Sequence, residues 1–579
     1  MRERSDGPSD SHGSVAVDRR DLLTGAIAAA GAAAMASPVG ARTERNPSGL
    51  GKSRADSDAI RAGTGIATTR TPAGQVAGYI QDDIVTFKGI PYGADTGGAN
   101  RFRPPAPPKP WTGIRSARAY GPVSPQDKGT GRLNDEEAFV FQWNDSVENE
   151  DCLRLNVWTP SVTGGRRPVL VWLHGGGFAA GSGHDLPAFD GLNLAKRGDV
   201  VVVTVNHRLN LFGFFDLSSF GPDCAQSGNA GMLDIVAALR WIHDTIDQFG
   251  GDPDRVLMFG QSGGGAKVSA LMGMPAARGL FHRAVVMSGS FAPCTTPEKS
   301  ARLTNLTLAE LGIARGPDTV ERLRALPYAQ LLRASDVVLA RVNRPSAGFI
   351  DARRLGNNLG FAPVVDGTTL MRLAERADMP DISGDVPMMI GSTLNEFVTG
   401  INHPEVEAMR EADLVAKVET VAPGRSAAVI AAFRHRTPDA SPFDLWSRIA
   451  TAPIRQSAVD QALAKSSGKA PAYLYWFTWQ TPILDGRPRA FHCLDIPFMF
   501  ANSERCATMT GGGPRAAALS GRMADALVAF ARTGTPNHPG LPSWPPVTSS
   551  TVASMILDDH PRVELDPDRV ERATVTRSA

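Results

Sequence analysis

The sequence has no excess of charge of either sign and no long apolar run in its main body. Its 579 residues carry 60 Lys and Arg against 59 Asp and Glu, a net charge of +1. Proteins that bind nucleic acid concentrate basic residues on one surface, so this balance does not indicate a nucleic-acid partner. No uninterrupted apolar run of about 18 residues occurs beyond the first forty positions, which argues against a membrane span in the mature chain.

Cysteine is also scarce, with five residues and no CxxC spacing. This pattern does not indicate a metal site, and we expect neither a metal nor a cofactor. An odd number leaves at least one thiol free or bonded outside the chain. Two pairings stay open, Cys493 with Cys506 and Cys224 with Cys294.

The first 41 residues have the order of an export signal. Arg19 and Arg20 precede a mild apolar run over 22–36 that is too short and weak to span a membrane. Cleavage is expected after Ala36 or Ala41. The segment resembles a bacterial twin-arginine signal and predicts a periplasmic or secreted protein, with a disordered Ala-rich tail as the alternative. Residues 42–72 are rich in polar residues and glycine and indicate a disordered lead-in.

The centre of the chain alternates strands and helices. VLVWL at 169–173 and VVVVTV at 200–205 are nearly continuous apolar runs, typical of a parallel sheet covered on both faces. A short helix is expected at 192–196, and apolar residues recur at helical spacing over 229–248. This order predicts the α/β class, with a doubly wound, mostly parallel central sheet in one domain over 73–579. Residues 300–480 have a mostly helical pattern and predict a helical lobe.

GQSGG at 260–264 is the most informative motif. VLMF at 256–259 predicts a buried strand before it, and the small residues that follow are compatible with a helix. A serine on a sharp strand-to-helix turn, with glycines two positions before and after, is the nucleophile elbow of α/β-hydrolases. Only very small neighbours let the strand and the helix close around the strained serine. Ser262 is therefore the predicted nucleophile.

HGGGF at 174–178 follows the strand that ends at Leu173. Its glycines allow backbone N–H groups to turn inward, so we assign Gly176, Gly177 and the N–H of Gly263 to an oxyanion hole. A plain glycine-rich turn is the alternative. A phosphate cradle is disfavoured because the loop lacks the GK[ST] of a P-loop.

At this point the chain resembles the type-B carboxylesterase family, which includes the cholinesterases. The resemblance extends from about Gly74 to the C-terminus. Besides the elbow it includes five blocks in the family's order, which are EDCLRLNV at 150–157, SGNAGMLD at 227–234, FGGDP at 249–253, FAPVVDG at 361–367 and FARTGTPN at 530–537.

The resemblance implies an α/β-hydrolase fold whose helical lobe forms the gorge and pocket. It also implies His492, in AFHCLDIPF at 490–498, as the catalytic base and Glu396, in GSTLNEF at 391–397, as the acid. From the residues alone, Asp366 and Asp385 are equal candidates for the acid. The implied reaction is ester hydrolysis through an acyl-enzyme, with a small-molecule ester as substrate.

Three positions depart from the family pattern. Gln261 stands where a glutamate is usual, and Gly263 where an alanine is usual, although the N–H of residue 263 is kept. Ser124 stands at the place of the disulfide partner of Cys152, so Cys152 is expected to be a free, buried thiol. The pairs Arg101 with Glu150 and Arg208 with Asp234 resemble family salt bridges and are assigned to fold support.

Other functions stay open on the same residues. An amidase, a lactonase or a carbamate hydrolase would use the same triad, and the fold also occurs in catalytically silent binding modules. The natural ester, the acyl and alcohol preference and the oligomeric state do not follow from the sequence.

Overall fold

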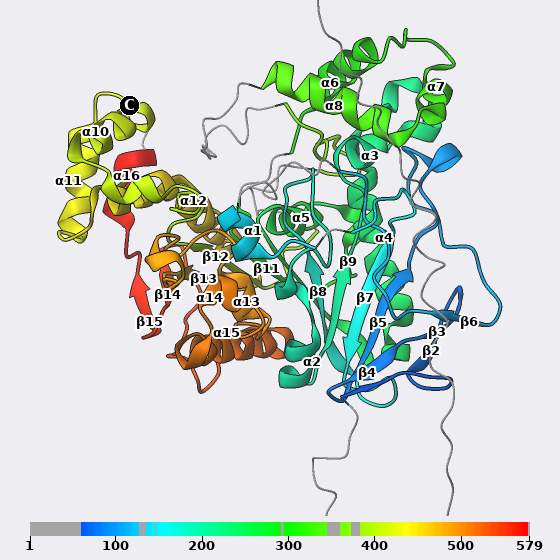
Figure 1. The fold of residues 1–579 in the computed structure, drawn as a ribbon, viewed down its shortest axis with the longest axis horizontal. Helices are drawn as coiled ribbons and strands as arrows, with labels where there is room; N and C mark the ends of the chain where they lie inside the picture. Colours follow the sequence, from blue (N-terminus) through cyan, green and yellow to red (C-terminus); the bar gives the residue numbers. More distant parts are fainter. Residues whose placement is uncertain are drawn as a thin grey trace, which may run out of the picture. The chain divides into compact units, whose positions relative to one another are not determined.

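A computed structural model describes residues 59–126, 135–144, 146–290, 294–343, 359–371 and 382–576. The predicted export signal at 1–41 lies outside these residues. Within them a large sheet of 12 strands organises the fold (Figure 1). Its strands in spatial order are β1 (Ile60–Arg61), β4 (Tyr79–Gln81), β5 (Ile84–Pro91), β7 (Arg154–Thr159), β9 (Val201–Val205), β8 (Arg167–Leu173), β10 (Gly251–Gln261), β11 (Arg283–Met287), β12 (Met388–Thr393), β13 (Ala472–Phe477), β14 (Ala553–Leu557) and β15 (Arg562–Leu565).

The sheet is parallel in its centre and antiparallel at both edges. All pairs from β9 through β14 are parallel, whereas β1, β4, β5, β7 and β9 pair antiparallel, as do β14 and β15. The carboxyl ends of the parallel strands therefore meet at one edge of the sheet, where ligands bind in open α/β folds. The predicted fold class, a mostly parallel sheet with helices on both faces, is confirmed.

Regular structure is present before the predicted domain boundary at residue 73. A second, small sheet contains β2 (Thr68–Thr71), β3 (Gly74–Ala77) and β6 (Ile114–Ser116), and β1 joins the edge of the large sheet. β1 and β2 lie inside the segment 42–72, for which the sequence indicated a disordered lead-in. Strands of two and four residues are too short for a period-2 pattern, and β2 is defined instead by its pairing with β3.

Side chains of the central strands alternate between two cores, as the two-residue period of a strand requires. In β8, Val169 and Val171 point to one core, and Leu170 and Trp172 point to the other. Both faces are covered by helices, so every residue of β9 is buried. This double cover explains why the central strands are apolar without alternation.

The helices expected at 192–196, over 229–248 and after Ser262 are all present. The helices of the main body are α1 (Asp135–Phe141), α2 (Leu192–Gly198), α3 (Asn210–Phe214), α4 (Ala230–Thr245), α5 (Gly263–Leu271), α13 (Asp495–Met499), α14 (Ala507–Thr510) and α15 (Gly513–Thr533). Side chains of α4 and α5 pack in the core that contains Val169, and those of α2 and α15 in the core that contains Trp172. α15 is closed by Gly534, which has a left-handed φ of 81°.

The expected helical lobe occupies the stretch between β11 and β13. It contains α6 (Pro297–Glu310), α7 (Thr319–Ala325), α8 (Tyr328–Val342), α10 (Glu411–Val421), α11 (Ser426–Arg436) and α12 (Pro442–Ser466). Figure 1 shows α6, α7 and α8 together in green, and α10 and α11 in yellow beside the C-terminal α16 (Arg569–Thr576). α10, α11, α12 and α16 share a third apolar core of their own.

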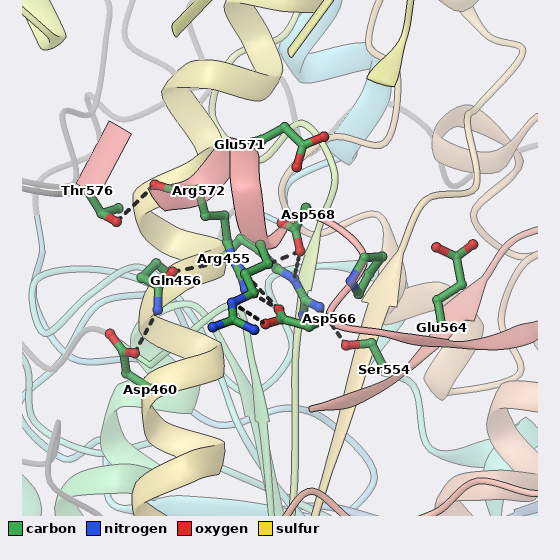
Figure 2. Close-up of polar contacts among 12 residues, drawn as sticks. Arg455, Gln456, Asp460, Ser554, Glu564, Asp566, Asp568, Glu571, Arg572 and Thr576 are labelled. Carbon is green, nitrogen blue, oxygen red and sulfur yellow. Dashed lines mark hydrogen bonds and ion pairs between the residues drawn. The ribbon is translucent and has the colours of Figure 1, made fainter. Parts of the chain in front are cut away.

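A buried ion-pair network fastens the C-terminal segment to α12 (Figure 2). Arg455 on α12 donates to the carbonyl of Tyr475 at 3.2 Å and to Ser554 Oγ at 2.7 Å, and its Nε lies 3.7 Å from Asp568. Arg572 on α16 pairs with Asp568 as well, at 3.4 Å. The two guanidinium groups thus share one carboxylate, which joins α12, the sheet and α16.

The two expected fold-supporting salt bridges are present. Arg101 pairs with Glu150 at 2.5 Å, and Arg208 pairs with Asp234 at 2.6 Å with both side chains almost fully buried. Cys224, Cys493 and Cys506 form no disulfide, so neither open pairing forms in this structure. Burial raises the pKa of the Cys152 thiol far above its usual range, which keeps it protonated and unreactive.

Candidate active site

Ser262 stands on the turn between β10 and α5. Its backbone has φ 56° and ψ −124°, a region that residues with a side chain rarely adopt. Its N–H donates to the carbonyl of Met287 at 2.8 Å, and its own carbonyl accepts from Ala266 at 3.0 Å. The strained turn is therefore held by β11 on one side and by α5 on the other, and it places the serine at the carboxyl end of the sheet.

The glycines around Ser262 allow a backbone approach that no other residue would permit. A Cβ on Gly264 would lie 1.9 Å from the carbonyl oxygen of Leu173, and one on Gly260 would lie 2.5 Å from the carbonyl carbon of Gly264. Real Cβ atoms do not approach other atoms so closely. The strand-to-helix turn therefore depends on glycine at both positions, as the motif predicted.

The glycine loop follows β8, the neighbour of β10 in the sheet. Gly176 and Gly177 have φ of 79° and 62°, and a Cβ on Gly176 would lie 2.3 Å from the carbonyl oxygen of Ala180. A Cβ on Gly263 would lie 2.4 Å from the backbone nitrogen of Gly177. Among the described residues, the N–H groups of Gly176, Gly177 and Gly263 donate to no protein acceptor.

His492 and Glu396 are in direct contact. His492 Nδ1 donates to Glu396 Oε2 at 2.5 Å, and the backbone N–H of His492 donates to the carbonyl of Glu396 at 2.8 Å. The carboxylate is completely buried, and its Oε1 accepts from the N–H of Thr393 at the end of β12 at 2.9 Å. The imidazole is therefore held through Nδ1, which leaves Nε2 as the basic nitrogen.

Gln261 and Phe397 complete the surroundings of the imidazole. The Phe397 ring lies 3.9 Å from the His492 ring, measured between centroids, and the Gln261 amide nitrogen lies 3.2 Å from Nε2. The Cys493 thiol donates to Gln261 Oε1 at 3.2 Å, and burial keeps its pKa well above the usual range. Because the thiol holds the amide oxygen, the amide nitrogen faces the imidazole. Within the described part of the chain, Ser262 Oγ makes no hydrogen bond with His492.

The sequence did not assign a contact to Gln261, Phe397 or Cys493. Each is the chain neighbour of a predicted site residue, and this adjacency was the available signal. The structure places the Gln261 amide, which stands where the family usually has a carboxylate, against the His492 ring.

The two other candidate acids lie elsewhere. Asp366 Oδ1 accepts from the N–H groups of residues 368, 369 and 370, and its Oδ2 accepts from Asn229 at 3.1 Å. Asp385 is exposed ahead of β12. Of the three acids left open by the residues alone, Glu396 is the one that the structure brings to His492.

The described residues hold no group of three or more His, Cys, Asp or Glu side chains arranged to bind a metal ion. In the same residues no helix is long and apolar enough to cross a lipid bilayer.

The sheet topology, the strained serine and the adjoining glycine loop define the protein as an α/β-hydrolase. The model of the carboxylesterase family matches residues 65–574, and the chain belongs to this family. It is 34% identical to para-nitrobenzyl esterase of Bacillus subtilis, over 87% of this chain and 97% of that protein. It is also 34% identical to phenmedipham hydrolase of Pseudarthrobacter oxydans, over 84% and 94%.

A solved structure extends the likeness to three dimensions. An esterase from Clostridium hathewayi, described as able to hydrolyse aliphatic aromatic polyesters, has a TM-score of 0.76 and 34% identity. The match covers 90% of this chain and 99% of that one. The protein is accordingly a carboxylesterase, an enzyme that hydrolyses carboxylic esters.

Proposed function

We propose that Ser262, His492 and Glu396 form the catalytic triad of this carboxylesterase, acting on small-molecule esters through an acyl-enzyme. The observation that carries the proposal is the 2.5 Å contact between His492 Nδ1 and the buried carboxylate of Glu396. It is supported by the strained serine and the glycine loop on the neighbouring strands β10 and β8. The order of serine, acid and histidine in the chain is the order that this fold uses.

In the first step, Ser262 Oγ attacks the acyl carbon of the ester and its proton passes to His492 Nε2. The carbonyl π electrons move to oxygen, and the resulting oxyanion accepts hydrogen bonds from the N–H groups of Gly176, Gly177 and Gly263. Those N–H groups donate to no protein acceptor within the described residues, so they are available for this role.

Collapse of the tetrahedral intermediate re-forms the carbonyl and expels the alcohol oxygen, which takes the proton from His492. The acyl group then remains on Ser262. A water molecule attacks this ester, gives its proton to Nε2, and a second collapse releases the carboxylic acid while Ser262 Oγ recovers the proton.

Glu396 holds the imidazole in one tautomer and stabilises the imidazolium that forms in both steps. The Gln261 amide occupies the Nε2 side of the ring in this structure, 3.2 Å away. The Ser262 hydroxyl therefore has to take the place of the amide at Nε2 when substrate binds. Nucleophile and base commonly close to hydrogen-bond distance only in the substrate complex.

The test is covalent labelling of the full-length protein with an organophosphate or a sulfonyl fluoride. Ser262 is the expected site, and Ser262→Ala is expected to lose the label and about 10³–10⁶-fold in kcat. Ser269→Ala, which removes a buried hydroxyl from α5, the helix that follows Ser262, serves as the control and should keep both the label and kcat. Full ester turnover by Ser262→Ala would rule the proposal out.

Hydrolysis of an amide, a lactone or a carbamate would use the same three catalytic residues as hydrolysis of an ester. These reactions differ in the bond that is cleaved. Two of the relatives are named for esters, whereas the name phenmedipham hydrolase refers to a carbamate, so these names favour esters over amides and lactones and leave carbamates open. We place the acyl and alcohol pockets in the helical lobe, as the family resemblance implies, and a para-nitrobenzyl ester is the first substrate to test. An ester and the amide with the same acyl group, tested beside a lactone and a carbamate of similar size, would distinguish the classes, and faster turnover of the amide than of its ester would exclude the esterase assignment.

A second proposal concerns the first 41 residues, which we assign to export by a twin-arginine signal, so that the mature enzyme is periplasmic or secreted. Fusion of residues 1–41 to a reporter that is active only after export tests it. Replacing Arg19 and Arg20 with lysine should abolish export, and unchanged export would exclude this route.

A further inference from the structure

Lys267 is a buried cation that the proposed reaction does not use. It lies on α5, the helix that begins directly after Ser262, and its side chain is 0% exposed. Its Nζ donates to the carbonyl oxygen of His174 at 2.9 Å and lies 5.8 Å from the centre of the Phe178 ring. Lys267 therefore connects α5, which follows Ser262 in the chain, to the start of the glycine loop, which follows β8.

Burial of this ammonium is unfavourable. It lowers the pKa of Lys267 to about 7, and the charge of Asp185 opposes the shift only in part. Lysine is seldom fully buried without a partner carboxylate, because removing its charge from water is costly. Proteins retain such locally unfavourable choices mainly at functional sites. Because Lys267 also lies on the helix that follows Ser262 and contacts the start of the glycine loop, we examine a role for it in the active site.

The carbonyls of the two peptide groups that precede Gly176 are both held, the first by Lys267 and the second by His174. The first peptide group joins His174 to Gly175, and Lys267 holds its carbonyl. The second joins Gly175 to Gly176, and His174 Nδ1 holds its carbonyl at 2.9 Å. A peptide group is planar, so a fixed carbonyl also fixes the direction of the N–H on its other side. In the second peptide group that N–H belongs to Gly176.

Burial, and to a lesser extent the charge of Lys267, keeps the neighbouring imidazole of His174 neutral. The pKa of His174 is lowered far below its usual range by burial, then by Lys267, then by His207. His207 stacks on His174 at 4.9 Å, and its pKa is lowered by burial and then by Lys267. Both rings are therefore neutral. The single proton of His174 is on Nδ1, because Nδ1 faces a carbonyl oxygen.

We infer that Lys267 is a positioning residue for the oxyanion hole: its ammonium fixes the His174 carbonyl and so helps to hold His174, whose Nδ1 fixes the Gly175 carbonyl and with it the direction of the Gly176 N–H. The inference rests on the proposed function, which assigns the Gly176 N–H to the oxyanion. Donors that act only on the developing oxyanion change kcat and leave ground-state binding nearly unchanged. Loss of Lys267 should therefore lower kcat and spare KM.

The experiment compares Lys267→Met with Lys465→Met in the full chain, using one soluble ester. Lys465 on α12 is the matched control, because it is also buried and its Nζ donates to backbone carbonyls of Ser383 and Gly384 at 2.8 and 3.2 Å. Lys267→Met should lose at least about 10-fold in kcat, with KM within about threefold, as expected when oxyanion donors are misplaced. Lys465→Met should keep both constants.

Two results would overturn the inference. One is a kcat for Lys267→Met within about threefold of the wild type, where removal of an oxyanion donor would have a far larger effect. The other is an equal fall in kcat for both variants, since this would reflect loosening of the fold. A trifluoromethyl ketone, whose adduct places an oxyanion in the hole, supplies a further measurement, and its affinity should fall in parallel with kcat for Lys267→Met.

A second variant covers the case in which Lys267→Met does not fold. Lys267→Gln keeps a neutral donor toward His174, and its kcat should lie between those of Lys267→Met and the wild type. Wild-type enzyme gives an independent measurement, because kcat should decline as the pH rises through about 7 and the ammonium loses its charge. The facing titratable groups His174 and His207 are neutral throughout this range, and Asp185 carries the opposing charge. A kcat that stays level above pH 7 would count against the inference.

Failure of the inference and failure of the proposed function give different results. If wild-type enzyme takes no covalent label on Ser262, the proposed function fails. If wild type and Lys267→Met are both labelled and turn over at the same rate, only the role of Lys267 is wrong.

Discussion

Gly263 and Gly177 touch through backbone atoms alone. A Cβ on Gly263 would lie 2.4 Å from both the nitrogen and the Cα of Gly177, and 2.3 Å from its carbonyl oxygen. The residue after the predicted nucleophile and the predicted oxyanion loop are thus in contact without any side chain between them. Position 263 is a glycine where an alanine is usual in the family, and the absence of a Cβ there leaves room for the backbone of Gly177.

The first prediction follows from this contact. Gly263→Ala should displace the glycine loop and lower kcat by about 10²–10³-fold, the effect of losing one oxyanion donor. Gly360→Ala is the control, because a Cβ there meets nothing within 4 Å, and it should leave kcat unchanged. Steady-state kinetics with a para-nitrophenyl ester check both. A wild-type rate for Gly263→Ala would show that the loop does not need this contact.

The second prediction separates the acid beside His492 from an acid that supports a loop. Glu396→Gln should lower kcat by about 10⁴-fold, because the amide no longer holds the imidazole in the productive tautomer. Asp366→Ala should keep kcat and lower the free energy of unfolding by about 1–3 kcal/mol, because backbone donors lose their acceptor. Kinetics and urea unfolding of both variants decide the matter, and an equal loss of kcat would reject the distinction.

The third prediction concerns pH and the buried carboxyl of Asp495. Burial raises its pKa to about 7, against the opposing effect of a hydrogen bond from Tyr475 Oη at 2.8 Å. The folded state then keeps a proton that the unfolded state releases above about pH 3.9. The stability that this proton contributes is full below about pH 3.9, declines as the pH rises, and is lost above about 7.

Asp495→Asn removes this titration and keeps an oxygen acceptor for Tyr475. Its unfolding free energy should rise relative to wild type by up to about 1.4 kcal/mol per pH unit between about pH 4 and 7, and the difference should level off above 7. Urea unfolding at several pH values from 5 to 8 measures the difference. Parallel curves for the two proteins would show that Asp495 does not titrate in this range.

The fourth prediction concerns the network in Figure 2. Arg455→Met should lower the free energy of unfolding by about 3–5 kcal/mol, because Asp568 loses one of its two buried cations and two oxygen acceptors lose a donor. Arg434→Met, in the exposed pair with Glu411, is the control and should leave stability unchanged. Equal stability of the two variants would mean that the network contributes nothing net.

The sequence predicted the central strands and the turn at Ser262 because both depend on residues that are adjacent in the chain. Apolar runs without alternation indicate a doubly covered parallel strand, and glycines at 260 and 264 indicate a turn that no side chain would fit. The short strands β1 and β2 were not predicted, because two to four residues are too few to show an alternation of apolar and polar side chains. These strands are defined by their pairing with β4 and β3.

The sequence by itself determined the class of fold, the turn at Ser262 and the glycine loop that follows β8. From the residues alone, Glu396, Asp366 and Asp385 were equal candidates for the catalytic acid, and only the family resemblance favoured Glu396. Tertiary structure decided which acid reaches His492, across 96 residues, and that Lys267 reaches the carbonyl of His174, across 93. The physical reason is that parallel strands far apart in the chain end at one edge of the sheet, and contacts made there depend on strand order rather than on distance along the sequence.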